Sequence, residues 1–401
     1  MKQTKYQGYR SFQYLEPETD YRAFELAPEL DRVPSRTVEV SAAQEERVHR
    51  LMDERFVISL HDHCVLKPLD FFADMADYRR QGRDWTGYAG MAISGLDAVI
   101  DGMMDGNATI TSAAGWKWED VIFDLGMRQS DIAHQDFVVQ GRTLDDLTRA
   151  KANGQIALIA SLEAATPIEN EVDRLDVLYG LGLRSCGIAY SESNTLGSGL
   201  KEARDGGLTA FGQQAVRRMN KLGIAIDISH SGDQTSLDVI AASDKPILIT
   251  HAGARALWNT KRMKPDEVIK ACAAKGGVIG IEAAPHTTLT KKHPKHDIEG
   301  FMEHFEYCAD LVGIDHVSFG PDTNFGDHVA VHHYFAKQLS IKAAHGQLDY
   351  EEVPFVDGIE NPGQAFPNIV RWLVKHEYSD DDIAKAIGGN TLRVLKEAWW
   401  R

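Results

Sequence analysis

The chain has 401 residues, which is enough for one large domain or two ordinary ones. Hydrophobic residues make up 43% of it and charged residues 25%, values typical of a globular protein, which argue against a largely disordered chain. The formal net charge of −16 argues against a nucleic-acid partner, because phosphate binding needs a surplus of Lys and Arg along one face.

The four cysteines lie far apart and form no CxxC pair, so the sequence predicts neither a disulfide framework nor a cysteine-ligated zinc site. Reduced thiols of this kind are typical of a cytoplasmic protein. The chain contains no signal-peptide core, no apolar segment of membrane-spanning length and no hydrophobic tail. We therefore expect no membrane partner, and a homodimer is compatible with the sequence.

Short apolar segments rich in Ile, Val, Leu or Ala alternate with amphipathic segments along most of the chain. Short continuous apolar segments are typical of strands that are buried on both faces of a parallel sheet. The expected strands are, in chain order, 56–63, 90–99, 155–163, 183–190, 223–230, 246–251, 277–282 and 316–322.

Amphipathic helices are predicted between these strands, with clear examples from Trp118, Leu208 and Lys264 onward. The last two end on glycine, as helix C-caps do, and Thr209 and Pro265 are their start signals. Alternating strands and helices predict a parallel sheet, and eight such units favour a closed (β/α)8 TIM barrel over an open sheet.

The barrel is expected to form a single catalytic domain over residues 51–401. Residues 1–50 are then an N-terminal extension packed on the barrel, and residues 326–362 an excursion outside it. This arrangement predicts one hydrophobic core with its functional site at the carboxyl ends of the strands.

Polar side chains close five of the expected strands, at the end of a barrel where catalysis takes place. They are His61 and His63 on the first strand, Glu163 on the third, His230 on the fifth, His251 on the sixth and Asp322 on the eighth. One such residue alone is more often a helix cap or an ordinary polar residue. However, strand alternation puts His61 and His63 on one face, with Asp62 pointing away. Because the strand ends of a barrel converge, the set as a whole predicts a metal site.

The residue types also indicate which metal to expect. Four imidazoles and a carboxylate suit Zn²⁺ or a neighbouring transition ion better than Mg²⁺ or Ca²⁺. Five ligands exceed the four that one tetrahedral zinc takes, so we expect two ions that share Glu163, whose two oxygens can bridge them. Water held between two such ions becomes a nucleophile near neutral pH. Asp322 is then the candidate proton shuttle to the leaving group.

These residues and their surroundings resemble the membrane (renal) dipeptidase family, peptidase family M19 of the amidohydrolase superfamily. The resemblance is carried by the motifs LGIAIDISHSG, KPILITHAGARAL, KRMKPDEV, GGVIGI, GIDHVSFGPD and GGNTLRVL, and it extends in order from about Phe56 to Leu395. It implies a (β/α)8 barrel that holds two zinc ions.

The resemblance also implies a role for each site residue. His61 and His63 would hold one ion and His230 and His251 the other, with Glu163 as the bridge and Asp322 as the proton relay. Arg262 matches the arginine that binds the substrate's carboxylate, for which a bidentate guanidinium is well suited. The alternative for Arg262 is a solvated charge before a helix.

Three positions depart from the family pattern. His63 stands where the family has aspartate, which makes the ligand shell one charge less negative and predicts weaker binding of the first ion or a different metal. Tyr190 stands where the family has a histidine near the substrate's carbonyl. It is either a hydrogen-bond donor to a developing oxyanion or a plain core or rim tyrosine. The segment PDTNFGD replaces the family's Asp-Phe-Asp-Gly.

The leading hypothesis is a binuclear metallohydrolase that cleaves an amide bond of a small carboxylate-bearing substrate, a dipeptide or an N-acyl amino acid. The close alternative is a specialised amidase or lactonase that acts on a non-peptide metabolite. A third hypothesis is a non-catalytic metal-binding barrel. The five ligand residues together with Asp322 argue against it, because buried polar groups cost stability and a site without turnover has no physical reason to keep them.

Overall fold

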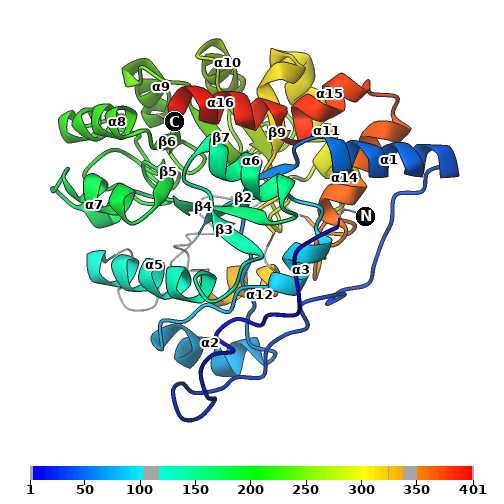
Figure 1. Ribbon diagram of the computed structural model, residues 1–401. Helices are drawn as coiled ribbons and strands as arrows, with labels where there is room; N and C mark the ends of the chain where they lie inside the picture. Colours follow the sequence, from blue (N-terminus) through cyan, green and yellow to red (C-terminus); the bar gives the residue numbers. More distant parts are fainter. Residues whose placement is uncertain (1–2, 103–116, 324, 337–349, 400–401) are drawn as a thin grey trace.

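The computed structural model describes residues 3–102, 117–323, 325–336 and 350–399. Within these residues a parallel sheet curls into a barrel surrounded by helices (Figure 1). Its strands follow one another in the order β1 (Ile58–Asp62), β2 (Ala98–Gly102), β4 (Ile156–Leu162), β5 (Leu183–Gly187), β6 (Ala225–Asp227), β7 (Leu248–Ala252), β8 (Val278–Ile281) and β9 (Val317–Phe319). A short strand, β3 (Val138–Gln140), lies outside this order and pairs with β4.

The two ends of the sheet meet just beyond β9. The backbone N–H of Asp322 donates to the carbonyl of His61 at 2.9 Å, and the N–H of His63 donates to the carbonyl of Thr323 at 2.9 Å. These bonds set the residues that follow β9 beside those that end β1. The predicted (β/α)8 barrel is confirmed, and its closure brings the ends of the first and last strands to one place.

The prediction of the second strand at residues 90–99 is wrong in its position. Its first part is helix α3 (Tyr88–Ile93), and the strand β2 begins at Ala98 and runs to Gly102. Gly95, with a φ of +77°, separates the two elements. A short apolar segment does not distinguish a buried helix from a buried strand, and this is the reason for the error.

The helices around the barrel follow the predicted alternation with the strands. They are α5 (Trp118–Ile132), α6 (Leu144–Ala152), α7 (Arg174–Gly180), α8 (Ala210–Leu222), α9 (Asp233–Ala242), α10 (Asp266–Ala274), α11 (Ile298–Val312), α14 (Ala365–Lys375), α15 (Asp380–Ala384) and α16 (Asn390–Ala398). The predicted start of α8 is confirmed, since the Thr209 hydroxyl accepts from the N–H of Gly212 at 2.9 Å. Its predicted glycine end is confirmed as well, because Gly223 is left-handed, with a φ of +80°.

Two further helices, α2 (Phe71–Arg80) and α12 (His328–Tyr334), lie on the side where the strands end (Figure 1). The rings of Phe71 and Tyr334 meet there with centroids 5.8 Å apart. Helix α12 lies within the expected excursion, 326–362, of which residues 337–349 fall outside the described residues. These helices therefore cover the mouth of the barrel rather than its wall.

The amino-terminal segment packs on the helical layer. Phe12 is fully buried, and its N–H donates to the Asp131 carboxylate of α5 at 2.7 Å. Helix α1 (Ala42–Glu54) then runs beside α14, and Glu45 pairs with Arg371 at 2.6 Å. Because α1 crosses residue 50, the division between an N-terminal extension and a barrel domain stays a prediction.

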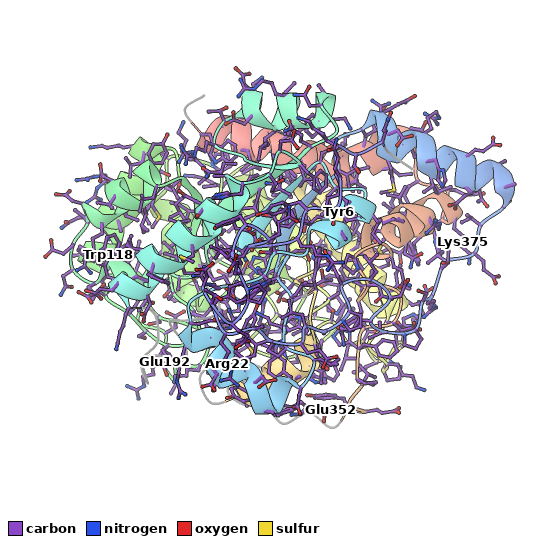
Figure 2. The ribbon with its side chains drawn as sticks, turned by 60° about the horizontal axis from the view of Figure 1, so that its bottom comes forward. Tyr6, Arg22, Trp118, Glu192, Glu352 and Lys375 are labelled. Atoms are coloured by element: carbon purple, nitrogen blue, oxygen red, sulfur yellow. The ribbon has the colours of Figure 1, made fainter. Side chains whose placement is uncertain are left out.

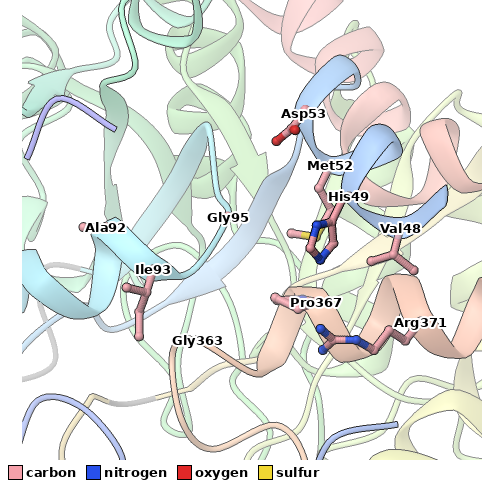
Figure 3. A pocket seen from close by; sticks show the side chains of 10 residues that line it. All are labelled: Val48, His49, Met52, Asp53, Ala92, Ile93, Gly95, Gly363, Pro367 and Arg371. Atoms are coloured by element: carbon pink, nitrogen blue, oxygen red, sulfur yellow. The ribbon is translucent and has the colours of Figure 1, made fainter. Parts of the chain in front are cut away.

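An apolar cavity of about 270 Å³ opens between α1, α3 and α14 (Figure 3). Met52, Ile93 and Pro367 are among the residues that line it, and none of the predicted site residues does so. This cavity is therefore separate from the candidate site. Within the described residues, no helix combines the length and the apolar character that a membrane span requires.

A buried ion pair ties the helical layer to the barrel and yields a prediction about stability. Arg128 of α5 donates to Asp101 of β2 at 2.6 Å, and each side chain is 1% exposed. Replacing Arg128→Met leaves a buried carboxylate without its charged partner, so the free energy of urea unfolding should fall by about 3–5 kcal/mol. The double variant Arg128→Met, Asp101→Asn should recover part of this loss. An unfolding free energy of Arg128→Met equal to that of the wild type would contradict the prediction.

Candidate active site

The five predicted ligand side chains converge at the mouth of the barrel. His61 lies in β1 and His63 directly after it, Glu163 follows β4, His230 follows β6, and His251 lies in β7. All five are buried, from 0% exposed for His251 to 6% for His63 and His230. The structure thus brings together side chains from four strands that lie far apart in the sequence.

The two carboxylate oxygens of Glu163 face different pairs of imidazoles. Glu163 Oε1 lies 3.6 Å from His63 Nε2 and 3.9 Å from His61 Nε2. Glu163 Oε2 lies 3.3 Å from His230 Nε2 and 3.9 Å from His251 Nε2. Donor atoms around one tetrahedral zinc lie about 3.4 Å apart, given Zn–N bonds of about 2.0–2.1 Å. Each half of the cluster therefore has the spacing of a metal-ligand set, with Glu163 common to both.

Hydrogen bonds on the far side of the His63 and His251 rings fix which nitrogen of each points inward. His63 Nδ1 lies 3.1 Å from the carbonyl oxygen of Gly102, and His251 Nδ1 lies 2.8 Å from Thr250 Oγ1. The Thr250 hydroxyl in turn donates to Asp227 at 2.8 Å. Burial lowers the pKa of His251 well below its ordinary value, so its imidazole is neutral, which is the form that binds metal. Partners of this kind orient metal ligands in proteins.

Asp322 lies against the first imidazole pair. Its Oδ1 is 3.2 Å from His63 Nε2 and 3.6 Å from His61 Nε2. Burial raises the pKa of Asp322, but the hydrogen bond from His63 and the surrounding imidazoles outweigh burial and hold the pKa below its ordinary value. The backbone of Asp322 has a φ of +57°, which is uncommon outside glycine and is often found at functional sites. Asp322 is thus an ionised carboxylate beside the first imidazole pair, and its role as proton relay stays a prediction.

Asp62 points away from the cluster, as strand alternation predicts. Its carboxylate accepts from the N–H of Thr323 at 2.8 Å and from the Thr323 hydroxyl at 2.7 Å. The unusual segment PDTNFGD thereby contacts the back of the ligand strand at Thr323, while its residue 324 falls outside the described residues. Asp62 therefore has a structural partner and no place among the ligands.

Gly102, which ends β2, is a site residue that sequence reasoning missed. A Cβ atom at this position would lie 2.8 Å from Cε1 of His61, 2.8 Å from Cε1 of His63 and 3.1 Å from Glu163 Oε1. Only a residue without a side chain leaves room for these three groups to meet. Gly102 was not recognised as a strand-end residue because the second strand was predicted to end at residue 99.

The replacement Gly102→Ala is expected to displace the first imidazole pair and lower the zinc content of the protein. The reason is that the new methyl group would lie 2.8 Å from Cε1 of each ring, which is closer than Cβ atoms approach other heavy atoms in proteins. Zinc per chain, measured after reloading and gel filtration, checks this. The control is Gly126→Ala, because a Cβ at Gly126 of α5 meets nothing within 4 Å. Equal zinc content in the two variants would argue against a ligand role for the pair.

Arg262 is buried beside the second imidazole pair, which rules out the alternative of a solvated charge. It is 3% exposed, and its Nη1 donates to the carbonyl oxygen of His251 at 3.0 Å. Its guanidinium also forms an ion pair with Glu282, which is fully buried. Burial raises the pKa of Glu282 to about 8, against the opposing effect of Arg262. The role of Arg262 as an anchor for a substrate carboxylate stays a prediction.

Glu282 is the second residue that sequence reasoning missed. It directly follows β8. The seventh expected strand, 277–282, therefore also ends in a carboxylate, and this residue could have been named from the same strand-end rule. Its carboxyl group faces the Arg262 guanidinium, so the protonation state of Glu282 decides how far the positive charge of Arg262 is offset.

Tyr190 lies beside the second imidazole pair. Its ring stacks on that of His230, with centroids 3.9 Å apart and an angle of 22° between the planes. This contact puts the tyrosine next to the proposed metal ligands rather than in the core. Its role as a donor to an oxyanion stays a prediction.

A (β/α)8 barrel with a cluster of imidazoles and carboxylates at its mouth is the architecture of an amidohydrolase-type protein. The family model of membrane dipeptidase (peptidase family M19) matches residues 46–333. The chain therefore belongs to this family, and the resemblance in its motifs is confirmed.

Individual relatives agree with this assignment. Dipeptidase tcpJ from Claviceps purpurea is 27% identical over 268 residues, which cover 66% of this chain and 56% of that relative. An amidohydrolase from Pseudomonas aeruginosa matches with a TM-score of 0.72 and 25% identity, over 88% of this chain and 99% of the other. The probable dipeptidase PvdM from Pseudomonas aeruginosa matches with a TM-score of 0.70 and 20% identity, over 90% and 99%. The chain thus spans less than two thirds of the length of the fungal dipeptidase.

Proposed function

We propose that the protein is a binuclear metallohydrolase that cleaves an amide bond of a small substrate with a free carboxylate, such as a dipeptide or an N-acyl amino acid. The observation that carries this proposal is the division of four imidazoles between the two oxygens of Glu163. Membership of the membrane dipeptidase family and the likeness to a fungal dipeptidase support the choice of an amide bond.

The donor set favours two zinc ions, one held by His61 and His63 and the other by His230 and His251, with Glu163 between them. When bound, two such ions activate water and polarise the scissile carbonyl. Side chains of the protein then accept and donate the protons. Asp322 accepts a proton from the attacking water as the C–O bond forms.

The remaining steps use the same carboxyl group and two neighbouring side chains. Asp322 donates its proton to the amine as the C–N bond breaks, so the products are a carboxylic acid and a free amine. The Tyr190 hydroxyl donates a hydrogen bond to the developing oxyanion, a role supported by the stacking of its ring on His230. Arg262 supplies positive charge for the substrate's carboxylate, and Glu282 offsets part of that charge when it is ionised.

A substrate panel tests the proposal and separates it from its alternatives. Zinc-loaded protein is assayed with L-L and L-D dipeptides, N-acyl amino acids and lactones, each with and without a chelator. We expect turnover of a dipeptide or an acyl amino acid that is abolished by the chelator and restored by zinc. Turnover of lactones or non-peptide amides alone would favour the specialised enzyme, and no turnover by fully loaded protein would favour a non-catalytic barrel.

We also propose a cytoplasmic location. All four cysteines are free thiols, and all are buried. Cell fractionation tests this, and recovery of the protein outside the cytoplasm would contradict it.

A further inference from the structure

A second group of metal-binding side chains lies outside the candidate active site. His286, His333 and Glu352 place one ligand atom each within 4.8 Å of one another. His286 follows β8, His333 belongs to α12, and Glu352 belongs to the segment described from residue 350 onward. We propose that these three residues form a separate binding site for one transition-metal ion, with zinc as the ion of choice.

Glu352 stands between the two imidazoles of this group. Its Oε1 pairs directly with His333 Nε2 and lies 3.7 Å from His286 Nε2. The second distance is close to the separation of about 3.4 Å between donors on one tetrahedral zinc. Two imidazoles and one carboxylate are a common protein set for zinc, which takes its fourth ligand from water. The group thus offers the donor types that the ion requires, with all three ligand atoms within 4.8 Å of one another.

The backbone and the surroundings of His286 favour a fixed ligand. Its backbone has a φ of +68°, a left-handed conformation that is uncommon for histidine and is often found at functional sites. Its side chain is 6% exposed, whereas those of His333 and Glu352 are 52% and 51% exposed. One ligand is therefore held in place, and the other two face solvent, from which an ion can enter. Figure 2 shows Glu352 at the edge of the molecule.

This site is distinct from the cluster around Glu163. A row of rings separates the two, with centroid distances of 6.4 Å from His63 to His328, 4.7 Å from His328 to His332 and 6.3 Å from His332 to His286. Two of these rings belong to α12, which lies over the mouth of the barrel. An ion bound at the outer site would therefore tie α12 to the segment after β8 and hold it over the candidate active site.

Metal analysis of single variants tests this inference. Chelator-treated protein is reloaded with zinc, freed of excess by gel filtration and analysed for zinc per chain. We expect His333→Ala and Glu352→Gln each to bind one ion fewer than the wild type, while the remaining ions stay bound. Glu352→Gln keeps the size of a half-exposed side chain, so it is expected to fold.

The matched control is His49→Ala. His49 also pairs with a glutamate, Glu45, at 3.0 Å and has a similarly exposed side chain, at 46%, but it belongs to no three-ligand group among the described residues. Its variant should keep the wild-type zinc content. If all three variants bind as much zinc as the wild type, the group is an ion pair only and the inference is wrong. That result would leave the proposed hydrolase function untouched, because the ligands around Glu163 are unchanged in every variant.

Discussion

Glu163→Gln is expected to lose zinc and to reduce kcat/KM by about 10³-fold, the equivalent of about 4 kcal/mol of the stabilisation that metal ions give a transition state. Glu163 is the carboxylate that lies between two pairs of imidazoles, and each of its oxygens faces one pair. The amide of glutamine keeps the shape of the side chain but removes its charge and one of its two acceptor oxygens. Both halves of the cluster should therefore bind their ions more weakly.

Zinc per chain and kcat/KM on the best substrate of the panel check this prediction. Glu54→Gln is the control, since Glu54 is an α1 glutamate whose side chain is 57% exposed. It should match the wild type in both measurements. Full zinc content together with full activity in Glu163→Gln would show that the carboxylate is not a ligand.

Asp322→Asn is expected to reduce kcat by about 10²–10⁴-fold, which is the usual contribution of a positioned proton carrier. Asparagine can no longer accept a proton from water or return it to the amine. The zinc content should stay at the wild-type value, because the four imidazoles and Glu163 are unchanged. This combination distinguishes a proton carrier from a metal ligand, since loss of a ligand lowers both quantities.

The measurements are kcat at saturating substrate and zinc per chain on the same preparation. Asp315→Asn serves as the control, because Asp315 is 61% exposed and pairs with Lys385 away from the cluster. A parallel loss of zinc and activity in Asp322→Asn would instead make Asp322 a ligand, and activity within tenfold of the wild type would exclude it as the proton carrier.

Much of the site could be predicted from the sequence because a closed parallel barrel converts strand ends into neighbours. His61, Glu163 and His251 lie far apart in the chain, yet each ends an apolar segment, so closure of the barrel was enough to bring them together. The distances to the two oxygens of Glu163 could not be predicted, since they depend on the side-chain directions that bonds such as His251 to Thr250 impose.

The errors have equally specific causes. Gly102 has no side chain to signal its role, and its importance depends on how closely the His61 and His63 rings approach it. The pairing of Arg262 with Glu282 joins the loop after β7 to the end of β8, and no spacing in the sequence indicates that contact.

The group of His286, His333 and Glu352 could not be predicted from the ends of the strands, for a similar reason. Its members come from α12 and from segments that belong to no strand. Their meeting depends on how those segments fold over the mouth of the barrel, which the periodicity of the sequence does not encode.

The most direct measurement is anomalous X-ray diffraction from crystals of zinc-loaded protein, recorded above and below the zinc absorption edge. We expect two peaks on opposite sides of the Glu163 carboxylate, one beside His61 and His63 and one beside His230 and His251. A single peak at this carboxylate, or none, would contradict the binuclear centre on which the proposed hydrolase rests.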